Sequence, residues 1–417
     1  MKPQEQKAAL AAFGMVFMLM AAYFILRPVR DAMASDWTDT ELSRLWNLQF
    51  FLSLGVVGLY GFAVSRVPFR YLMPAIYGAF ALTFLLFYLV TPLLSQRTRV
   101  EKGFYLWVTV FSLLNISAFW SFMSDTFTQD QARRLFPFIS AGASAGAMMG
   151  PTIPLLFSQR LGPDSLMVIA SVALLLVIPM AICLGRAKAA AAVASSPERD
   201  RRDHSMGGPW WSGFRDTLRN RYLLGMAVFI LLYVFVGSFV YFQQKNILAE
   251  FTRAERASIL GGIDWGVNLL TFVFAFAVTG RMVGRLGMGL TLASVPLVLV
   301  VGLGVLAFAP VLTVLLGLQV ARRVGNYSVT RPAREMLFTE VSQEERFKAK
   351  PVIDVVVYRG GDAVSASLFA LLTDGLGLGI AVVSLAGALI AALWAGMGMQ
   401  LGRQYRSQRM GSSTHPV

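Results

Sequence analysis

Residues 351–371 read PVIDVVVYRGGDAVSASLFAL, an apolar run long enough to cross a bilayer that nevertheless contains Asp354, Arg359 and Asp362. The hydrocarbon core of a membrane is about 30 Å thick, and an α-helix rises about 1.5 Å per residue. If the helix begins near one membrane surface at Pro351, Asp362 lies about 16 Å deep, near the middle of the bilayer. A charge there costs about 2.5–3.5 kcal/mol on insertion scales, so such residues face a water-filled path or pair with one another.

These charges allow two interpretations. Arg359 and Asp362 are three residues apart and can form an ion pair along one helix face. Asp354, Tyr358 and Asp362 follow at helical spacing on a face that would point into a helix bundle. Either the pair only ties this helix to a neighbour, or these residues bind a substrate or exchange protons. We predict Arg359 as a substrate-binding residue, and Asp354 and Asp362 as proton-coupling or gating residues.

The rest of the chain has the same apolar character. Of its 417 residues, 56% are hydrophobic and 14% are charged, whereas soluble domains contain about 25% charged residues. The pattern predicts an all-α protein that crosses the membrane many times. The net charge is +14, but the basic residues lie in short loops between apolar runs, a distribution that sets membrane topology and argues against a nucleic-acid partner.

Hydropathy and punctuation by glycine and proline predict twelve transmembrane helices. The predicted spans are residues 9–30, 44–64, 71–94, 103–123, 136–157, 165–184, 221–243, 257–280, 287–308, 310–330, 351–372 and 376–401. Placing both termini in the cytoplasm puts most of the 37 Lys and Arg residues on the inner side, as the positive-inside rule requires. We expect a multi-pass, monomeric protein of a bacterial inner membrane, with lipid and a small molecule as its partners.

The two halves of the sequence resemble each other. TQDQARRLFP at 128–137 aligns without gaps to SQEERFKAKP at 342–351. We therefore predict a six-helix half at 1–185, a cytoplasmic linker at 186–220 and a second six-helix half with a tail at 221–417. This is the layout of major-facilitator transporters, whose substrate site lies near the middle of the membrane. The end of the linker, WWSGFRDTLRNR, predicts either a helix on the membrane surface or a plain linker with interfacial tryptophans.

A second charged cluster ends the first predicted span, in the sequence YFILRPVRDAM. Arg27 and Asp31 are four residues apart and can pair, whereas Arg30 is expected to project in another direction. Arginine side chains offer planar forks for carboxylate or phosphate groups. We predict Arg27 and Arg30 as substrate-binding residues and Asp31 as a coupling or gating residue. The alternative is that they are ordinary interfacial arginines at a helix end.

Three further polar residues lie within predicted spans. Asp264 and Asn268 are four residues apart in one span, and Asn115 lies in the middle of another. We predict all three as substrate-binding residues, although a lone Asn more often forms a hydrogen bond between helices. The small residues of ISAGASAGAMMGP, from Ile139 to Pro151, predict close helix packing; the run lacks the Gly-Lys-Ser/Thr ending of a phosphate loop.

The composition disfavours enzyme chemistry. The chain has one cysteine, Cys183, so it cannot form an internal disulfide or a cysteine metal cluster. Both histidines, His204 and His415, lie outside the predicted spans. We therefore expect no metal, no cofactor and no enzyme activity.

Three segments resemble the ATP/ADP carrier family, the nucleotide transporters of plastids and intracellular bacteria. They are YFILRPVRD at 23–31, FWSFMSDTFTQDQARRLFPFISAGASAG at 119–146 and REMLFTEVSQEERFKAKPVIDVV at 334–356. The resemblance implies a twelve-helix, major-facilitator-like fold, alternating access, and nucleotide binding by basic residues, with Arg30 at a basic position of the family.

The chain departs from that family at two places. Family members have an acidic residue in the fourth helix, where residues 104–120 have none, and a lysine where this chain has Asp362. The resemblance therefore implies the fold and transport more strongly than it implies ATP exchange.

These observations predict a secondary transporter that works by alternating access. Its substrate would be a small organic anion or zwitterion, with nucleotide-like compounds included and with proton coupling by acidic residues. An alternative is an exporter of drugs or amphipathic metabolites, whose cavity some of the 31 Phe and 19 Met residues would line. A more remote alternative is a membrane scaffold or enzyme without transport.

Overall fold

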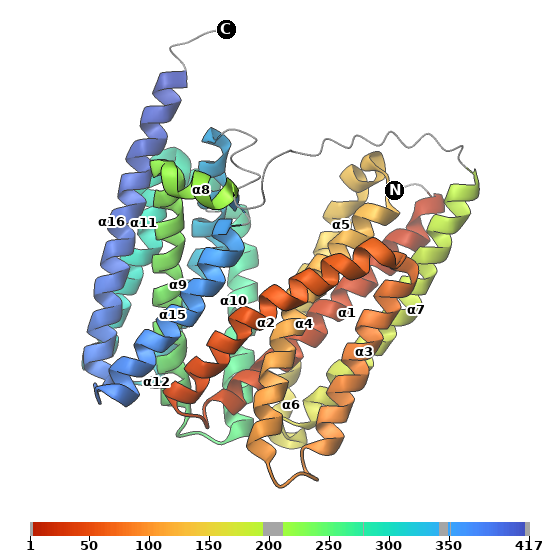
Figure 1. The fold of residues 1–417 in the computed structure, drawn as a ribbon, viewed down its shortest axis with the longest axis horizontal. Coiled ribbons are helices and arrows are strands. Elements are labelled where there is room, and N and C mark those ends of the chain that lie inside the picture. Colours follow the sequence, from red (N-terminus) through yellow and green to blue (C-terminus); the bar gives the residue numbers. More distant parts are fainter. Residues whose placement is uncertain (1–2, 195–211, 278, 342–348, 351, 413–417) are drawn as a thin grey trace. The chain divides into compact units, whose positions relative to one another are not determined.

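The computed structural model describes residues 3–194, 212–277, 279–341, 349–350 and 352–412, and the regular elements in these ranges are helices (Figure 1). Within this part of the chain, ten helices are long and apolar enough to cross a membrane. Their length and composition are those of lipid-spanning helices, in which every backbone group is bonded within its own segment. The chain is therefore a multi-pass membrane protein.

The first seven helices are α1 (Pro3–Ala34), α2 (Asp39–Arg66), α3 (Phe69–Val90), α4 (Arg97–Thr126), α5 (Gln129–Met149), α6 (Thr152–Leu161) and α7 (Ser165–Ala194). They are followed by α8 (Ser212–Arg219), α9 (Arg221–Leu248), α10 (Arg253–Ala277), α11 (Thr279–Phe308), α12 (Leu312–Gly325), α13 (Arg331–Leu337), α15 (Tyr358–Ala370) and α16 (Ile380–Ser412). Wider π-helical turns occupy Asn326–Thr330, Val352–Val357 and Leu371–Gly375.

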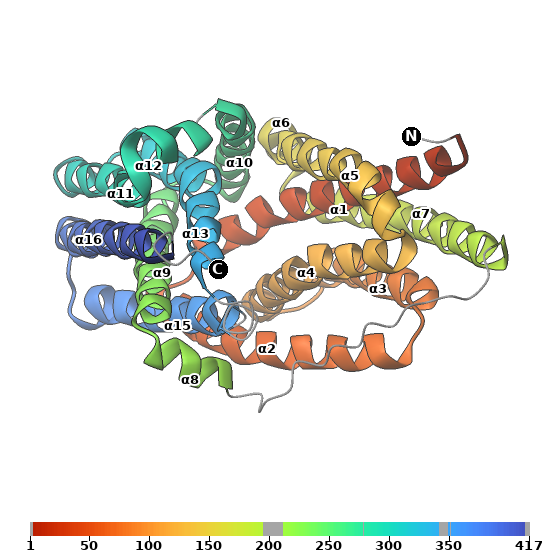
Figure 2. The same ribbon diagram turned by 90° about the horizontal axis from the view of Figure 1, so that it is seen from above.

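Two predicted spans are each built from shorter pieces. The span predicted at 136–157 is divided between α5 and α6, which follow one another almost in line in Figure 2. The division falls at Pro151, whose nitrogen has no hydrogen to continue the helical bonding. The span predicted at 310–330 consists of α12 and the π-helical turn Asn326–Thr330, after which the helix continues as α13.

Packing divides the chain into two compact units. The first unit contains α1, α3 to α7, the part of α2 from Phe51 onward and the part of α10 up to Asn268. The second contains the remainder of α2 and α10 together with α8, α9 and α11 to α16. Each unit thus draws helices from both predicted sequence halves. The division into halves joined by the linker 186–220 stays a prediction, and residues 195–211 lie outside the described residues.

Glycines bring helices α1 and α5 of the first unit into backbone contact. A methyl group on Gly142 would lie 2.7 Å from the carbonyl oxygen of Phe13, and one on Gly150 would lie 2.7 Å from that of Ala21. Gly146 meets the Phe17 carbonyl in the same way. The prediction that the run ISAGASAGAMMGP forms a close packing surface is confirmed, because only glycine fits at these positions.

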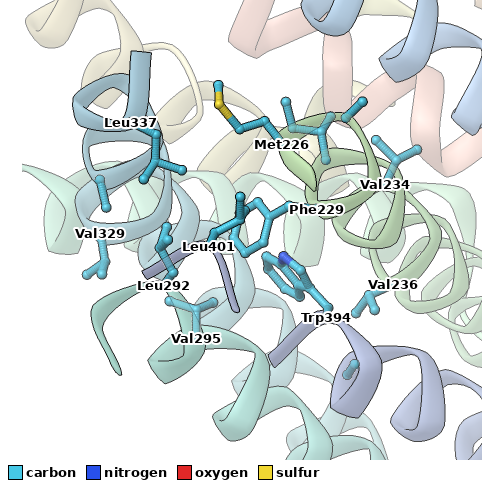
Figure 3. Packing of buried hydrophobic residues seen from close by; sticks show 14 of the residues in the cluster. Met226, Phe229, Val234, Val236, Leu292, Val295, Val329, Leu337, Trp394 and Leu401 are labelled. Atoms are coloured by element: carbon cyan, nitrogen blue, oxygen red, sulfur yellow. The ribbon is translucent and has the colours of Figure 1, made fainter. Parts of the chain in front are cut away.

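The second unit has a core of buried apolar side chains. Helices α11 and α16 run side by side (Figure 1), and their backbones are in contact where Gly289 of α11 meets Gly402 of α16. Trp394 of α16 is fully buried, and its ring centroid lies 5.5 Å from that of Phe229 on α9 (Figure 3). Truncating a core aromatic of this kind typically costs about 3–5 kcal/mol of stability. This packing holds α9, whose Gln244 and Ser238 bond to polar side chains of α12 and α15.

Candidate functional site

Four charged side chains meet in the first unit. Arg27 Nε lies 3.7 Å from Asp31 Oδ2, and Arg27 Nη1 lies 3.5 Å from Asp264 Oδ1 on α10. The predicted pairing of Arg27 with Asp31 is confirmed. Asp31 and Asp264 are only 6% and 3% exposed, and burial of an unpaired carboxylate at such sites would be very unfavourable. The cluster therefore depends on its arginines.

Arg30 belongs to the same cluster. Its Nη2 and Nε donate to Asp31 Oδ1 at 2.7 and 2.9 Å, so the expectation that it projects in another direction is wrong. The long side chain folds back onto the neighbouring carboxylate, and its guanidinium lies 5.0 Å from the ring centroid of Tyr105. Nη1 donates to the hydroxyl of Thr109 at 3.4 Å. Two arginines and two aspartates thus balance one another in charge.

Both predicted asparagines bond to the backbone of another helix. Asn115 is buried on α4, and its amide nitrogen donates to the carbonyl of Leu19 on α1 at 3.1 Å. Asn268 donates to the carbonyl of Ala147 at 2.6 Å. Ala147 is the residue whose helical partner Pro151 lacks an N–H, so Asn268 replaces the lost bond. These contacts are those of interhelical hydrogen bonding; contact with a substrate stays a prediction.

A second charge network of the first unit lies where its helices end. Arg253 donates to Glu101 Oε1 and to Asp36 Oδ2, each at 2.5 Å, and Arg256 donates to Asp36 Oδ1 at 2.5 Å. Burial would raise the pKa of Asp36, but the hydrogen bonds from Arg256 and Arg253 lower it below its ordinary value. This network was not predicted from the sequence. The available signal was charge at the ends of the predicted spans, which also fits ordinary topology.

The charged residues Asp354, Arg359 and Asp362 lie in the second unit. Arg359 Nη1 is 3.5 Å from Asp362 Oδ2, with 22% and 18% of these side chains exposed, so the predicted pair is confirmed. Asp354 pairs instead with Arg334 of α13 at 3.2 Å. It sits in the π-helical turn Val352–Val357, whose wider winding interrupts the α-helical spacing assumed for the predicted stripe.

Asp354 is part of an ionic cluster that contains further charges. Arg334 also contacts Glu335 at 3.2 Å, and Lys350 Nζ lies 2.6 Å from Glu335 Oε2. Burial would raise the pKa of Glu335, but the hydrogen bonds from Lys350 and Arg334 lower it. The gating role of Asp354 stays a prediction. The structure gives Asp354 an ion-pair partner, Arg334.

Arg322 of the second unit was not among the predicted site residues. Arg322 of α12 is partly buried, and its Nε and Nη2 donate to Gln319 Oε1 at 3.2 and 2.9 Å. The signal that could have identified it is its position inside the predicted span 310–330.

Among the residues that the structure describes, no group of three or more His, Cys, Asp or Glu side chains is arranged to hold a metal ion.

Comparisons with known proteins identify the fold. No family model and no curated protein matches this chain, so the likeness to ATP/ADP carriers remains a resemblance. A bacterial homologue of the human lysosomal transporter Spinster, inward-facing and unoccupied, is similar over 98% of this chain and 99% of that chain, with 13% identity and a TM-score of 0.64. The structure of the same homologue in its occupied, inward-facing form is similar over 98% of this chain and 99% of that chain, with 13% identity and a TM-score of 0.63.

A second solved structure, that of the nucleoside transporter NupG, is similar over 96% of this chain and 99% of that chain, with 12% identity and a TM-score of 0.65. Identities this low show the fold and no more. The predicted all-α, major-facilitator-like architecture is therefore confirmed, and this chain has the fold of major-facilitator-type transporters.

Proposed function

We propose that this chain is a secondary membrane transporter that works by alternating access and moves a small organic anion or zwitterion. The observation that supports this best is the presence of charged side chains inside apolar spans, at Arg27 and Asp264 in one unit and at Arg359 and Asp362 in the other. Well-packed apolar residues would stabilise such helices at least as well as buried ion pairs. Charges that persist there mark a path for a polar substrate or ion.

Each predicted residue has a proposed role. Substrate contacts are proposed for Arg27, Arg30, Asn115, Asp264, Asn268 and Arg359, and proton coupling or gating for Asp31, Asp354 and Asp362. The arginines would attract the anionic group, and an aspartate near an arginine can gain or lose a proton as its surroundings change. We propose a monomer in a bacterial inner membrane with both termini in the cytoplasm.

Ligand binding to the purified chain tests the substrate class. Nucleotides, sugar phosphates and organic acids, each as a panel, are added to the protein in detergent, and the midpoint of thermal unfolding is measured. A ligand present at 100 times its Kd stabilises the folded chain by about 2.7 kcal/mol. Nucleosides and nucleotides come first, because one protein of similar fold is a nucleoside transporter and because of the sequence resemblance.

Flux decides whether a bound compound is a substrate. The chain is reconstituted in lipid vesicles loaded with the unlabelled compound, and entry of labelled compound is followed. Saturable entry that depends on the internal compound supports the proposal. Vesicles in which none of the stabilising compounds exchanges would refute it.

Proton coupling rests on Asp362. Asp362→Asn keeps a side chain of the same size but cannot release a proton, so uptake should lose its dependence on an imposed pH gradient. Arg403→Gln, at an exposed position on α16, serves as the control and should transport normally. A pH response identical in Asp362→Asn and the unmodified chain would remove the coupling role.

A further inference from the structure

Arg322 holds a positive charge deep within α12. This helix begins at Leu312, and a rise of about 1.5 Å per residue puts Arg322 about 15 Å along it. Such a depth corresponds to the middle of a hydrocarbon core about 30 Å thick. An arginine there is costly unless a counter-ion, a hydrogen-bonding partner or water compensates its charge.

The groups that bond to Arg322 are neutral. Two of its nitrogens donate to the amide oxygen of Gln319, one helical turn earlier. The amide nitrogen of Gln319 in turn donates to the amide oxygen of Gln244 on α9. Both glutamines are buried. This chain of two amides orients the guanidinium but supplies no negative charge to balance it.

No carboxylate of the described residues bonds directly to Arg322. In the described part of the chain it forms no ion pair with Asp or Glu, and the nearby Asp362 is paired with Arg359. Arg322 and Arg359 therefore share the single carboxylate of Asp362, and the positive charge of this pair of arginines exceeds the negative charge. A guanidinium that is held in place and lacks a counter-ion is suited to bind one from outside.

One nitrogen of the Arg322 guanidinium, Nη1, has no hydrogen-bond partner among the described residues. This nitrogen lies against the backbone of α9 at Gly237, where an added methyl group would be 3.1 Å away. The phenol rings of Tyr233 and Tyr358, whose centroids are 6.2 Å apart, lie within electrostatic reach of the charge.

We propose that Arg322 binds an oxyanion, the carboxylate or phosphate group of the transported substrate, and that Gln319 and Gln244 position its guanidinium. The inference rests on the proposed transport function and assigns the anion-binding residue for it. The oxyanion supplies the missing negative charge and accepts hydrogen bonds from the planar fork. Arg359 is held by Asp362, so it is the less available of the two cations.

Inorganic phosphate is the probe for this site. The full-length chain in detergent is unfolded by heat in sodium phosphate and in sodium chloride of equal ionic strength. Phosphate should raise the midpoint of unfolding relative to chloride for the unmodified chain and for the exposed control Arg403→Gln. Arg322→Gln should abolish this difference, and Arg322→Lys should reduce it, because a lysine lacks the fork.

Gln319→Glu provides a second variant that preserves packing. It places a carboxylate where the amide oxygen now accepts from Arg322, so the guanidinium gains an internal counter-ion. Because the carboxylate cannot donate to Gln244 Oε1, the Gln244 amide has to turn so that its nitrogen donates instead. The variant should still fold in chloride, yet it should lose the phosphate effect. For a substrate established by the flux measurement, KM should rise at least tenfold in Arg322→Gln and in Gln319→Glu, and should be unchanged in Arg403→Gln.

A phosphate effect that persists in Arg322→Gln, or that is absent from the unmodified chain, would overturn the assignment. The same holds for an unchanged KM in Arg322→Gln, which would leave the proposed transport intact. Conversely, a phosphate effect that depends on Arg322 in a chain without any flux would refute transport but support the anion site.

Discussion

Both units of the molecule contain arginines inside apolar helices, but the side chains that surround these arginines differ between the units. In the first unit, Asp31 and Asp264 face Arg27 and Arg30, so the charges balance. In the second unit, Asp362 balances Arg359, whereas Arg322 bonds only to the neutral Gln319. A balanced buried cluster is strongly destabilised when one member is removed. A buried cation without a counter-ion is unfavourable for stability and is suited to bind an anionic ligand. Residues of the same type can therefore serve different purposes.

The largest effect is expected at Asp31. Asp31→Asn removes the carboxylate that both Arg27 and Arg30 contact, so the free energy of unfolding should fall by about 3–5 kcal/mol, as for other broken buried pairs. Denaturant unfolding of the purified chain measures this loss. Asp130→Asn, at an exposed position on α5, is the matched control and should change little. Equal stability of the two variants would show that the charged cluster of the first unit does not stabilise the folded chain.

A direct contrast between the units comes from Asp264→Asn and Asp362→Asn. Asp264 is almost fully buried, while Asp362 retains some contact with solvent. Asp264→Asn should therefore lower the free energy of unfolding more than Asp362→Asn, for which the loss should stay below about 1 kcal/mol. The same unfolding measurement applies to both. A larger loss for Asp362→Asn would show that the charged pair of the second unit, and not the cluster of the first, contributes more to stability.

The smallest effect concerns pH and Asp36, outside the spans. Its pKa is lowered by Arg256 and Arg253 despite the opposing effect of burial. The ionised form therefore stabilises the folded chain at pH values above the ordinary pKa of 3.8, and this contribution disappears as the pH falls through the folded pKa. The difference in unfolding midpoint between the unmodified chain and Asp36→Asn should be constant near neutral pH and shrink in acid. A difference independent of pH would mean that Arg253 and Arg256 do not act through this charge.

Much of the fold was predictable because it depends on short-range patterns. Runs of apolar residues predict membrane helices, since lipid admits no unpaired backbone. The pairs Arg27–Asp31 and Arg359–Asp362 follow from helical spacing alone. Where the local winding changes, as in the π-helical turn around Asp354, the same spacing rule fails.

The sequence by itself determined the membrane class, the helices and the pairings between residues three or four positions apart, because a helix places such residues on one face whatever surrounds it. Only the tertiary structure decided that Asp264 joins Arg27, that Asn268 bonds to Ala147, and that Arg322 is left with amide partners. Asp264 and Arg27 lie on different helices, as do Asn268 and Ala147. Which groups surround Arg322 likewise depends on how the helices pack. The physical reason is that helix packing, and not periodicity, sets which distant side chains share one dry environment.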